Sequence, residues 1–215
     1  MFADRNEAAI RLAAELGKYR GLNPLVLGIP RGAVPMACAI AGKLAGEADV
    51  TLVRKLGAPG NPELAIGAVD ETGWSHVTAR ARNTGTDSAY LERETRAQVE
   101  LLKARRAAYT AIRPAVDPQG RIVVVVDDGL ATGATMTAAL HALRARSPAK
   151  LICAVPVAPA ETIEDVSRHC DELVCLEIPG NFQSVGQFYR HFAQVSDDEV
   201  IAALKSPFRG PAPLS

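Results

Sequence analysis

The sequence predicts an α/β protein built on a doubly wound, mainly parallel sheet of about five strands. Short apolar runs alternate with amphipathic stretches of helical period along most of the chain, and such alternation produces right-handed parallel crossovers. The run Ile122 to Val126 has no polar alternation, which is typical of a central strand covered on both faces. Two apolar runs end in Gly-containing turns that lead into helical patterns, so we expect a ligand at that edge of the sheet.

Length and charge limit the class of protein. The chain has 215 residues, 48% of them hydrophobic, which predicts a single domain over residues 1–215. Basic and acidic residues both number 24, which argues against nucleic-acid and membrane partners. Residues 1–16 carry acids and no long apolar run, so we expect neither a signal peptide nor a membrane span, and a cytoplasmic location. The four cysteines lack metal-site spacing and are interpreted as buried free thiols: Cys38, Cys153, Cys170 and Cys175.

The first part of the chain predicts two helices and two strands. Asp4 and Glu7 have the spacing of a capping box ahead of an apolar helical stripe. A Gly/Pro turn separates the first strand from the second helix. The predicted bounds are 25–29 for the first strand, 34–44 for the second helix and 50–53 for the second strand.

The middle of the chain predicts a loop, a hairpin and a long helix. Residues 56–63 are rich in Gly, Pro and Asn, which indicates a mobile loop. Strands are expected at 65–69 and 74–78, with Trp74 on this ribbon and no ligand role. Thr86 or Asp87 caps a helix that runs to about Ile112. Residues 71–115 therefore form a helical and ribbon insertion, and the basic residues of 80–113 are interpreted as a solvated helix face.

The last part continues the alternation and ends in a hood. We expect helices at 134–146 and 159–169, strands at 150–155 and 172–178, and a frayed tail at 207–215. The segment 179–205 is aromatic, polar and glycine-containing, which suits a small hood over a ligand. Phe182 and Tyr189 either contact an acceptor or simply pack. Ser196 and Glu199 have the spacing of a capping box.

The stretch that follows the central strand has two chemical halves. Gly129 and Gly133 allow close backbone approach, and threonine hydroxyls lie beside a helix N-terminus, which favours a phosphate. The adjacent carboxylates Asp127 and Asp128 would instead be satisfied by sugar hydroxyls, by a magnesium ion bridged through water, or by positive charge on a sugar ring. Strand alternation would point the two acids to opposite faces, so the backbone must turn there. A ribose 5-phosphate carries both complementary parts.

Residues 123–135, VVVVDDGLATGAT, resemble the phosphoribosyl diphosphate signature of type I phosphoribosyltransferases. The resemblance implies a Rossmann-like core with a hood, and a Mg²⁺-dependent transfer of the 5-phosphoribosyl group to a nucleophilic acceptor with release of diphosphate. It implies that Asp127 and Asp128 stabilise the ribose charge and contact Mg²⁺ indirectly, through water or ribose hydroxyls. The implied substrate contacts, the last four of them to the 5-phosphate, are Gly129, Leu130, Ala131, Thr132, Gly133, Ala134 and Thr135.

Two further segments resemble the diphosphate-binding parts of this family. The turn with Arg31 and Gly32 is similar to its diphosphate loop, although Ala33 replaces the second glycine of the commoner form. Arg54 and Lys55 resemble the basic pair of orotate-type members, which would let Lys55 act on the diphosphate; a solvated basic strand end is the alternative.

The acceptor and the activity stay open at this stage. Ala131 stands where hypoxanthine-guanine members place an Asp, which counts against that subclass, and RKLGAPGNPE at 54–63 resembles a segment of uncharacterised phosphoribosyltransferase-like proteins. One alternative is a regulatory protein that senses phosphoribosyl diphosphate without turnover. Phosphoryl transfer is a third, disfavoured because the chain has no GxxxxGK(S/T) loop. Whether the chain works as a homodimer is also open.

Overall fold

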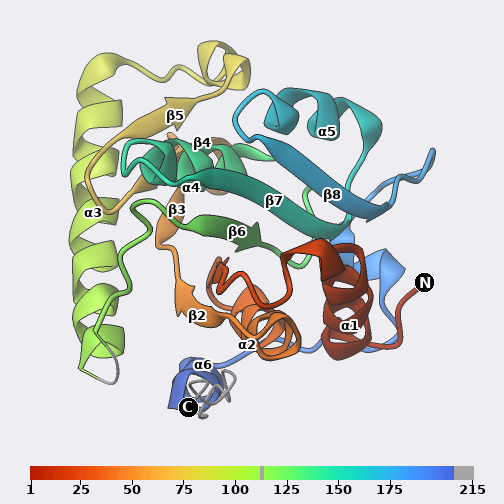
Figure 1. Ribbon diagram of the computed structural model, residues 1–215. Helices are drawn as coiled ribbons and strands as arrows, with labels where there is room; N and C mark the ends of the chain where they lie inside the picture. The colour runs from red at the N-terminus through yellow and green to blue at the C-terminus, as the bar shows by residue number, and fades with distance from the viewer. Residues whose placement is uncertain (112–113, 206–215) are drawn as a thin grey trace.

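The computed structural model describes residues 1–111 and 114–205 and centres on a five-stranded parallel sheet in the order β2-β1-β6-β7-β8 (Figure 1). Val123 to Val126 of β6 are fully buried, because both faces of this central strand are covered. The predicted α/β class and parallel sheet are therefore confirmed. The strands of this sheet are β1 (Leu25–Gly28), β2 (Glu47–Val50), β6 (Ile122–Val126), β7 (Lys150–Val157) and β8 (Glu172–Glu177).

Helices cover both faces of the sheet, as Figure 1 shows: α1 (Arg5–Glu15) and α2 (Ala33–Leu44) lie on one face, and α4 (Ala134–Arg144) and α5 (Ala160–Ser167) on the other. Helix α6 (Asp197–Lys205) packs on α2. The side chain of Asp4 accepts from the Glu7 N–H and caps α1, and Ser196 and Glu199 form the predicted capping box before α6. None of the helices described has the length and apolar content that crossing a bilayer would require.

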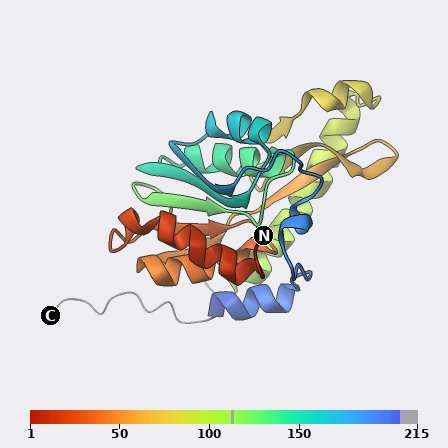
Figure 2. The same ribbon diagram turned by 90° about the vertical axis from the view of Figure 1, so that its right-hand side faces the viewer.

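A three-stranded antiparallel ribbon projects to one side of the main sheet (Figure 2). It consists of β3 (Val53–Ala58), β4 (Asn61–Asp70) and β5 (Ser75–Val77), and α3 (Ser88–Thr110) packs against β3 and β4. Asp87 caps α3 through the Tyr90 N–H, as predicted. Three short 3-10 helices complete the described elements: η1 (Gly17–Tyr19), η2 (Ala79–Asn83) and η3 (Val185–Phe188).

Two expectations were wrong in this region. The predicted strand 50–53 is two strands, because the chain leaves the parallel sheet after Val50 and starts the ribbon at Val53. The predicted loop 56–63 is the tip of a hairpin, in which only Pro59 and Gly60 separate β3 from β4 and Gly60 supplies a φ of +72°. Ile112 and the tail 207–215 lie outside the described residues.

The order of the strands places a crevice at the carboxyl ends of β1 and β6. From β1 the chain crosses through α2 to β2 on one side, whereas from β6 it crosses through α4 to β7 on the other. Strands β1 and β6 are direct neighbours, with Gly28 paired to Val126. The loops that follow them therefore diverge from adjacent strand ends, which is where open α/β sheets bind ligands.

Candidate functional site

Asp127 and Asp128 form an acidic turn directly after β6. The backbone N–H of Asp128 donates to Asp127 Oδ1 at 2.9 Å. Gly129 follows with a φ of +156°, and a Cβ there would press against the side chains of Val157 and Val185. The chain therefore turns at this point, as the sequence requires if both acids are to serve one site.

Arg5 from α1 is an unpredicted member of this site. Its Nε donates to Asp128 Oδ2 at 2.8 Å, and its Nη1 donates to the Ala193 carbonyl at 2.7 Å. The guanidinium also lies 3.9 Å from the centre of the Phe192 ring, which favours the cation. A Cβ at Gly32 would collide with both the Asp128 carboxylate and the Arg5 guanidinium. The close approach of these two side chains therefore favours Gly at position 32, and the predicted substrate contact of Gly32 stays a prediction.

The hood segment contacts the acidic turn through Tyr189. Tyr189 is 6% exposed, and its hydroxyl donates to the Asp128 carbonyl at 2.7 Å. Phe2 packs against this ring and pairs by backbone bonds with Phe188 and Arg190. The burial of Tyr189 favours the packing interpretation over contact with an acceptor.

Residues 129–133, which we call the phosphate loop, are fixed by two neighbouring elements. Leu130 N–H donates to the Val157 carbonyl of β7 at 2.9 Å, and Thr162 Oγ1 of α5 donates to the Ala131 carbonyl at 2.8 Å. Gly133 ends the loop with a φ of +70° directly before α4. Because a helix begins there with unpaired N–H groups and the positive end of its dipole, the loop is suited to an anion.

Both acids are costly to ionise in the folded protein. Burial raises the pKa of Asp127 well above its ordinary value, and the neighbouring Asp128 charge raises it further. Burial also raises the pKa of Asp128, although the Arg5 guanidinium opposes this. Lys55 and Arg5 both act to lower the pKa of Asp127. The pair therefore favours an added cation or hydroxyl donors over water alone.

A basic pocket of about 460 Å³ lies between the loop after β1, the ribbon and the first turn of α4. It joins the predicted residues Arg54, Lys55 and Thr135 to Pro30 of the loop after β1. Burial and the charge of Arg105, which also lines the pocket, lower the pKa of Arg54. The structure thus brings the β3 pair and the start of α4 together around one opening.

Arg31 is not brought into the basic pocket. Its Nη1 lies 3.7 Å from Asp197 Oδ2 of α6, and the peptide that joins Pro30 to Arg31 is cis. The predicted diphosphate contact of Arg31 stays a prediction.

The donor set is compatible with an indirectly held magnesium ion. No group of three or more His, Cys, Asp or Glu within 1–111 and 114–205 could hold a metal. Asp127 Oδ2 and Asp128 Oδ1 receive no hydrogen bond from the residues described. Two carboxylates with a free oxygen each suit Mg²⁺, which keeps several waters and takes its other ligands from a substrate.

The sequence does not mark Arg5 or Thr162 as members of the site. They are separated from the groups they contact by 123 and 31 residues respectively. Nothing in the local pattern of either helix marks these side chains as different from other surface Arg or Thr residues. Only the packing of α1 and α5 against the sheet brings them to the loop.

Comparison with known proteins identifies the family of this chain. The phosphoribosyl transferase domain model matches residues 3–192. Two proteins from strains of Mycobacterium tuberculosis, provisionally named phosphoribosyl transferases, are each 42% identical over 210 residues, which is 97% of this chain and 47% of theirs. The chain thus spans about half the length of these curated relatives.

The fold is also found in a solved structure. A crystal structure of a protein from Thermus thermophilus is 45% identical, with a TM-score of 0.80, and the match covers 95% of this chain and 97% of that one. Together with the domain match, which extends from α1 through the hood segment to residue 192, this shows that the chain belongs to the phosphoribosyl transferase domain family.

Proposed function

We propose that the protein transfers the 5-phosphoribosyl group of phosphoribosyl diphosphate to a small nucleophilic acceptor and releases diphosphate. The observation that carries this proposal is the succession of acidic turn and phosphate loop after one strand, at the point where the sheet's crossovers diverge. A basic pocket lies beside it. One opening thus offers partners for a phosphate, a hydroxylated ring and a second anionic group.

Each part of the donor has a complementary part of the site. The 5-phosphate binds the N-terminus of α4, where backbone N–H groups and the hydroxyls of Thr132 and Thr135 are available. The ribose hydroxyls donate to the carboxylates of Asp127 and Asp128. The diphosphate lies toward Lys55 and the loop after β1, where basic side chains lower the cost of its charge.

The same carboxylates stabilise the charge that develops during the reaction. As the bond to diphosphate breaks, positive charge grows on the ribose ring, and fixed negative charge nearby stabilises it. Asp127 and Asp128 must be ionised for this, and Lys55 and Arg5 help to keep them so. Mg²⁺, when bound through the diphosphate and water, would neutralise charge on the leaving group.

The experiment is a diphosphate-release assay with phosphoribosyl diphosphate, with and without Mg²⁺. Nucleobases, orotate, anthranilate and water are supplied as alternative acceptors. Release that depends on Mg²⁺ and on one acceptor class supports the transferase. Because Ala131 offers no proton-accepting group, we expect hypoxanthine and guanine to be poor acceptors.

One observation favours a second function, which is sensing of phosphoribosyl diphosphate without turnover. Arg5 already occupies Asp128 Oδ2, so one acid is partly neutralised from within the chain. A sensor would show saturable binding by calorimetry and no diphosphate release with any acceptor. Release at a rate above that of the Asp127→Asn variant would exclude this alternative.

A further inference from the structure

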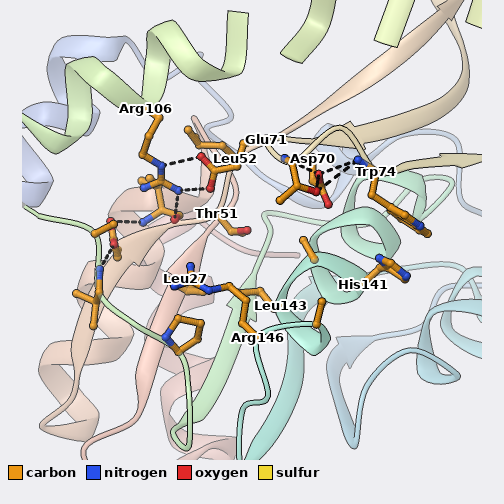
Figure 3. Close-up of a pocket in the computed structure, with 18 residues that line it drawn as sticks. Leu27, Thr51, Leu52, Asp70, Glu71, Trp74, Arg106, His141, Leu143 and Arg146 are labelled. Carbon is orange, nitrogen blue, oxygen red and sulfur yellow. Dashed lines mark hydrogen bonds and ion pairs between the residues drawn. The ribbon is translucent and has the colours of Figure 1, made fainter. Parts of the chain in front are cut away.

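A second pocket lies between the main sheet and the antiparallel ribbon, away from the candidate active site. Its volume is about 540 Å³, within the range of small-molecule sites. Figure 3 shows Leu27 and Leu143 on one side of this side pocket, Arg106 and Glu71 on the opposite side, and Asp70, Trp74 and His141 together at one end. It shares no lining residue with the basic pocket or with the phosphate loop.

Two unsatisfied polar atoms belong to residues of this side pocket. Only three buried side-chain polar atoms in the described part of the chain lack a hydrogen-bond partner. One, Gln98 Oε1, is on a residue that lines the basic pocket, and the other two, Asp70 Oδ2 and His141 Nδ1, are on residues that line the side pocket. Asp70 is only 1% exposed. A buried carboxylate oxygen without a donor is costly, so an added N–H donor at Asp70 Oδ2 would be favourable.

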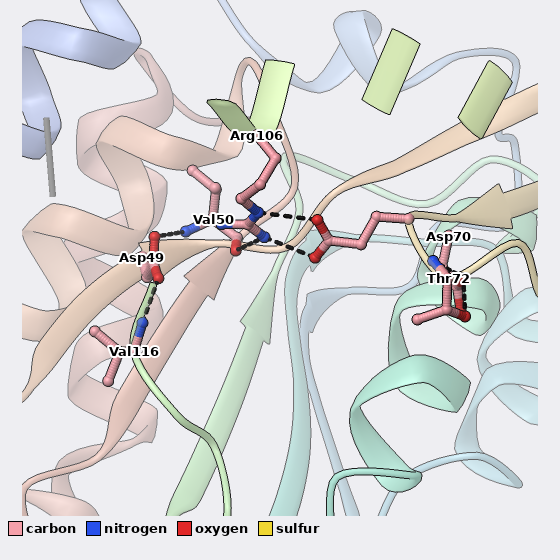
Figure 4. Close-up of polar contacts among 7 residues, drawn as sticks. Asp49, Val50, Asp70, Thr72, Arg106 and Val116 are labelled. Atoms are coloured by element: carbon pink, nitrogen blue, oxygen red, sulfur yellow. Dashed lines mark hydrogen bonds and ion pairs between the residues drawn. The ribbon is translucent and has the colours of Figure 1, made fainter. Parts of the chain in front are cut away.

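Several other polar groups of the side pocket are already engaged (Figure 4). Asp70 Oδ1 accepts from Thr72 N–H, Thr72 Oγ1 and Trp74 N–H at 2.7, 2.6 and 3.1 Å. Asp49 accepts from the backbone N–H groups of Val50 and Val116 at 2.7 and 2.9 Å. Arg106 binds both carboxylate oxygens of Glu71 at 2.9 Å.

These contacts leave negative charge without a counter-charge. All donors to Asp49 and Asp70 are neutral, and neither acid forms an ion pair within the residues described. Two arginines line the pocket, and both already have an acidic partner: Arg106 pairs with Glu71, and the 53% exposed Arg146 pairs with Asp117 at 3.2 Å. Thr51, 7% exposed, adds a hydroxyl that bonds to none of the described groups. The site therefore favours a ligand that brings positive charge and N–H donors.

The apolar lining of the side pocket indicates the shape and polarity of the rest of the ligand. Leu27, Leu52 and Leu143 are all at most 5% exposed, and Trp74 stacks on His141 with ring centres 3.4 Å apart and planes at 6°. This lining suits a flat apolar group more than a sugar or a phosphate.

We propose that the side pocket binds a small molecule with a flat apolar body and a protonated nitrogen group, whose N–H donates to Asp70 Oδ2. Arg54, Lys55 and Thr135, which line the basic pocket, do not line this site. The side pocket is therefore a ligand site additional to the phosphoribosyl site, and its occupancy does not require phosphoribosyl diphosphate.

The test uses benzamidine as the cationic probe and benzoate as an anion of the same ring size, measured by calorimetry and by fluorescence. Trp74 is the only Trp of the chain and lines the side pocket, so its emission reports occupancy directly. We expect saturable benzamidine binding with a change in Trp74 emission, and no comparable binding of benzoate. Absence of benzamidine binding, or equal binding of benzoate, would overturn the proposal.

Asp70→Asn tests whether the Asp70 carboxylate binds the cationic group of the ligand. The amide oxygen can still accept from Thr72 and Trp74, so the turn keeps its cap, while the charge and the second acceptor are lost. We expect benzamidine to bind about tenfold more weakly or worse. Asp165→Asn, an equal change of charge at a side chain that is 74% exposed and outside this pocket, should bind as the parent does.

Ala142→Phe provides a second variant in case Asp70→Asn does not fold. Ala142 lines the side pocket from α4, and a phenyl ring there would fill part of the volume. Benzamidine binding should be lost while far-ultraviolet circular dichroism is unchanged. Unchanged benzamidine affinity in a folded Asp70→Asn or Ala142→Phe variant would refute the assignment.

Discussion

Burial opposes ionisation of the Asp127 carboxyl group, whereas the proposed reaction needs its charge. This residue therefore affects stability and activity in opposite directions. Its pKa is raised in the folded protein, so the folded state holds the proton more tightly than the unfolded chain does. The stabilising contribution is present below the unfolded pKa and is lost as the pH rises through the folded pKa. Above the folded pKa, the ionised group therefore opposes folding.

Asp127→Asn removes this unfavourable charge together with the proposed ribose contact. We expect a higher Tm at pH 7 and a kcat for diphosphate release lower by about 10²–10³-fold. Calorimetry and the release assay measure both. Asp165→Asn, at an exposed position, should change neither, and an Asp127→Asn protein with full activity would contradict the site assignment.

Substitution of Arg5 tests how a neighbouring cation changes the pKa values of the two acids. Because its guanidinium lowers the pKa of both acids, Arg5→Gln should raise them and move the acidic limb of the pH–kcat/KM profile to higher pH. Arg11→Gln, on the same helix and 3.7 Å from Glu177, is the matched control and should leave the limb in place. An unmoved limb in Arg5→Gln would show that Arg5 serves packing alone.

At the scale of single residues, the sequence predicts those groups whose role follows from their neighbours in the chain. Asp127 and Asp128 follow an apolar strand and precede a Gly-rich turn, and the structure places them at the sheet edge as expected. Arg5 has no such local context, since its role comes from a contact across 123 residues.

Among the structural elements, the phosphate loop depends most on one glycine. Gly133 has a φ of +70°, and a Cβ would lie 2.7 Å from Val166 Cγ2 and 2.9 Å from Thr162 Cγ2 of α5. The loop must therefore fit both a left-handed backbone and a closely packed helix.

Gly133→Ala should destabilise the fold and weaken binding of phosphoribosyl diphosphate. The left-handed conformation alone costs about 1–2 kcal/mol, and the contact with α5 adds to this. Gly85→Ala is the matched control, because Gly85 has a φ of +69° and nothing within 4 Å of its added Cβ. Denaturant unfolding and calorimetry compare the two; equal losses of stability would mean that α5 moves away freely.

The sequence predicts the ends of an element where an apolar run meets charged residues. It does not predict them where the residues of one strand run into those of the next without such a break. Strand β6 agrees with its predicted bounds because Arg121 and Asp127 flank an apolar run. Residues 50–53 read as one strand because Thr51 and Leu52 continue the apolar pattern. The chain nevertheless changes sheets there, and the pairing partners of β2 and β3 lie elsewhere in the sequence.

The molecule as a whole completes its candidate site with segments far apart in the chain. Phe2 is fully buried between α1 and the hood segment and packs on Tyr189, which bonds to Asp128. The sequence predicted the parallel sheet and a hood, but not that residues 2–5 would lie beneath it. Contacts between segments so far apart leave no periodic pattern in the sequence, so they cannot be predicted from it.

Phe2→Ala should therefore affect more than stability. We expect a loss of about 3–5 kcal/mol in the free energy of unfolding and, under conditions where the variant remains folded, a lower kcat for diphosphate release. Leu102→Ala, at a 1% exposed position on α3, should cost about 2–5 kcal/mol without a comparable fall in kcat. Equal kcat values in the two folded variants would show that the Phe2 contact is structural only.

The bond between Arg5 and Ala193 spans 188 residues, and this has a consequence during protein synthesis. A nascent chain that has left the ribosome only as far as β8 already contains the acidic turn and the phosphate loop, but the peptide that carries Tyr189 and Phe192 is still inside the exit tunnel. Translation therefore delivers the contacts of Tyr189, Phe192 and Ala193 after Asp128 and Arg5, and a ribosome-bound fragment of this length holds the Arg5–Asp128 pair without the segment that supports it.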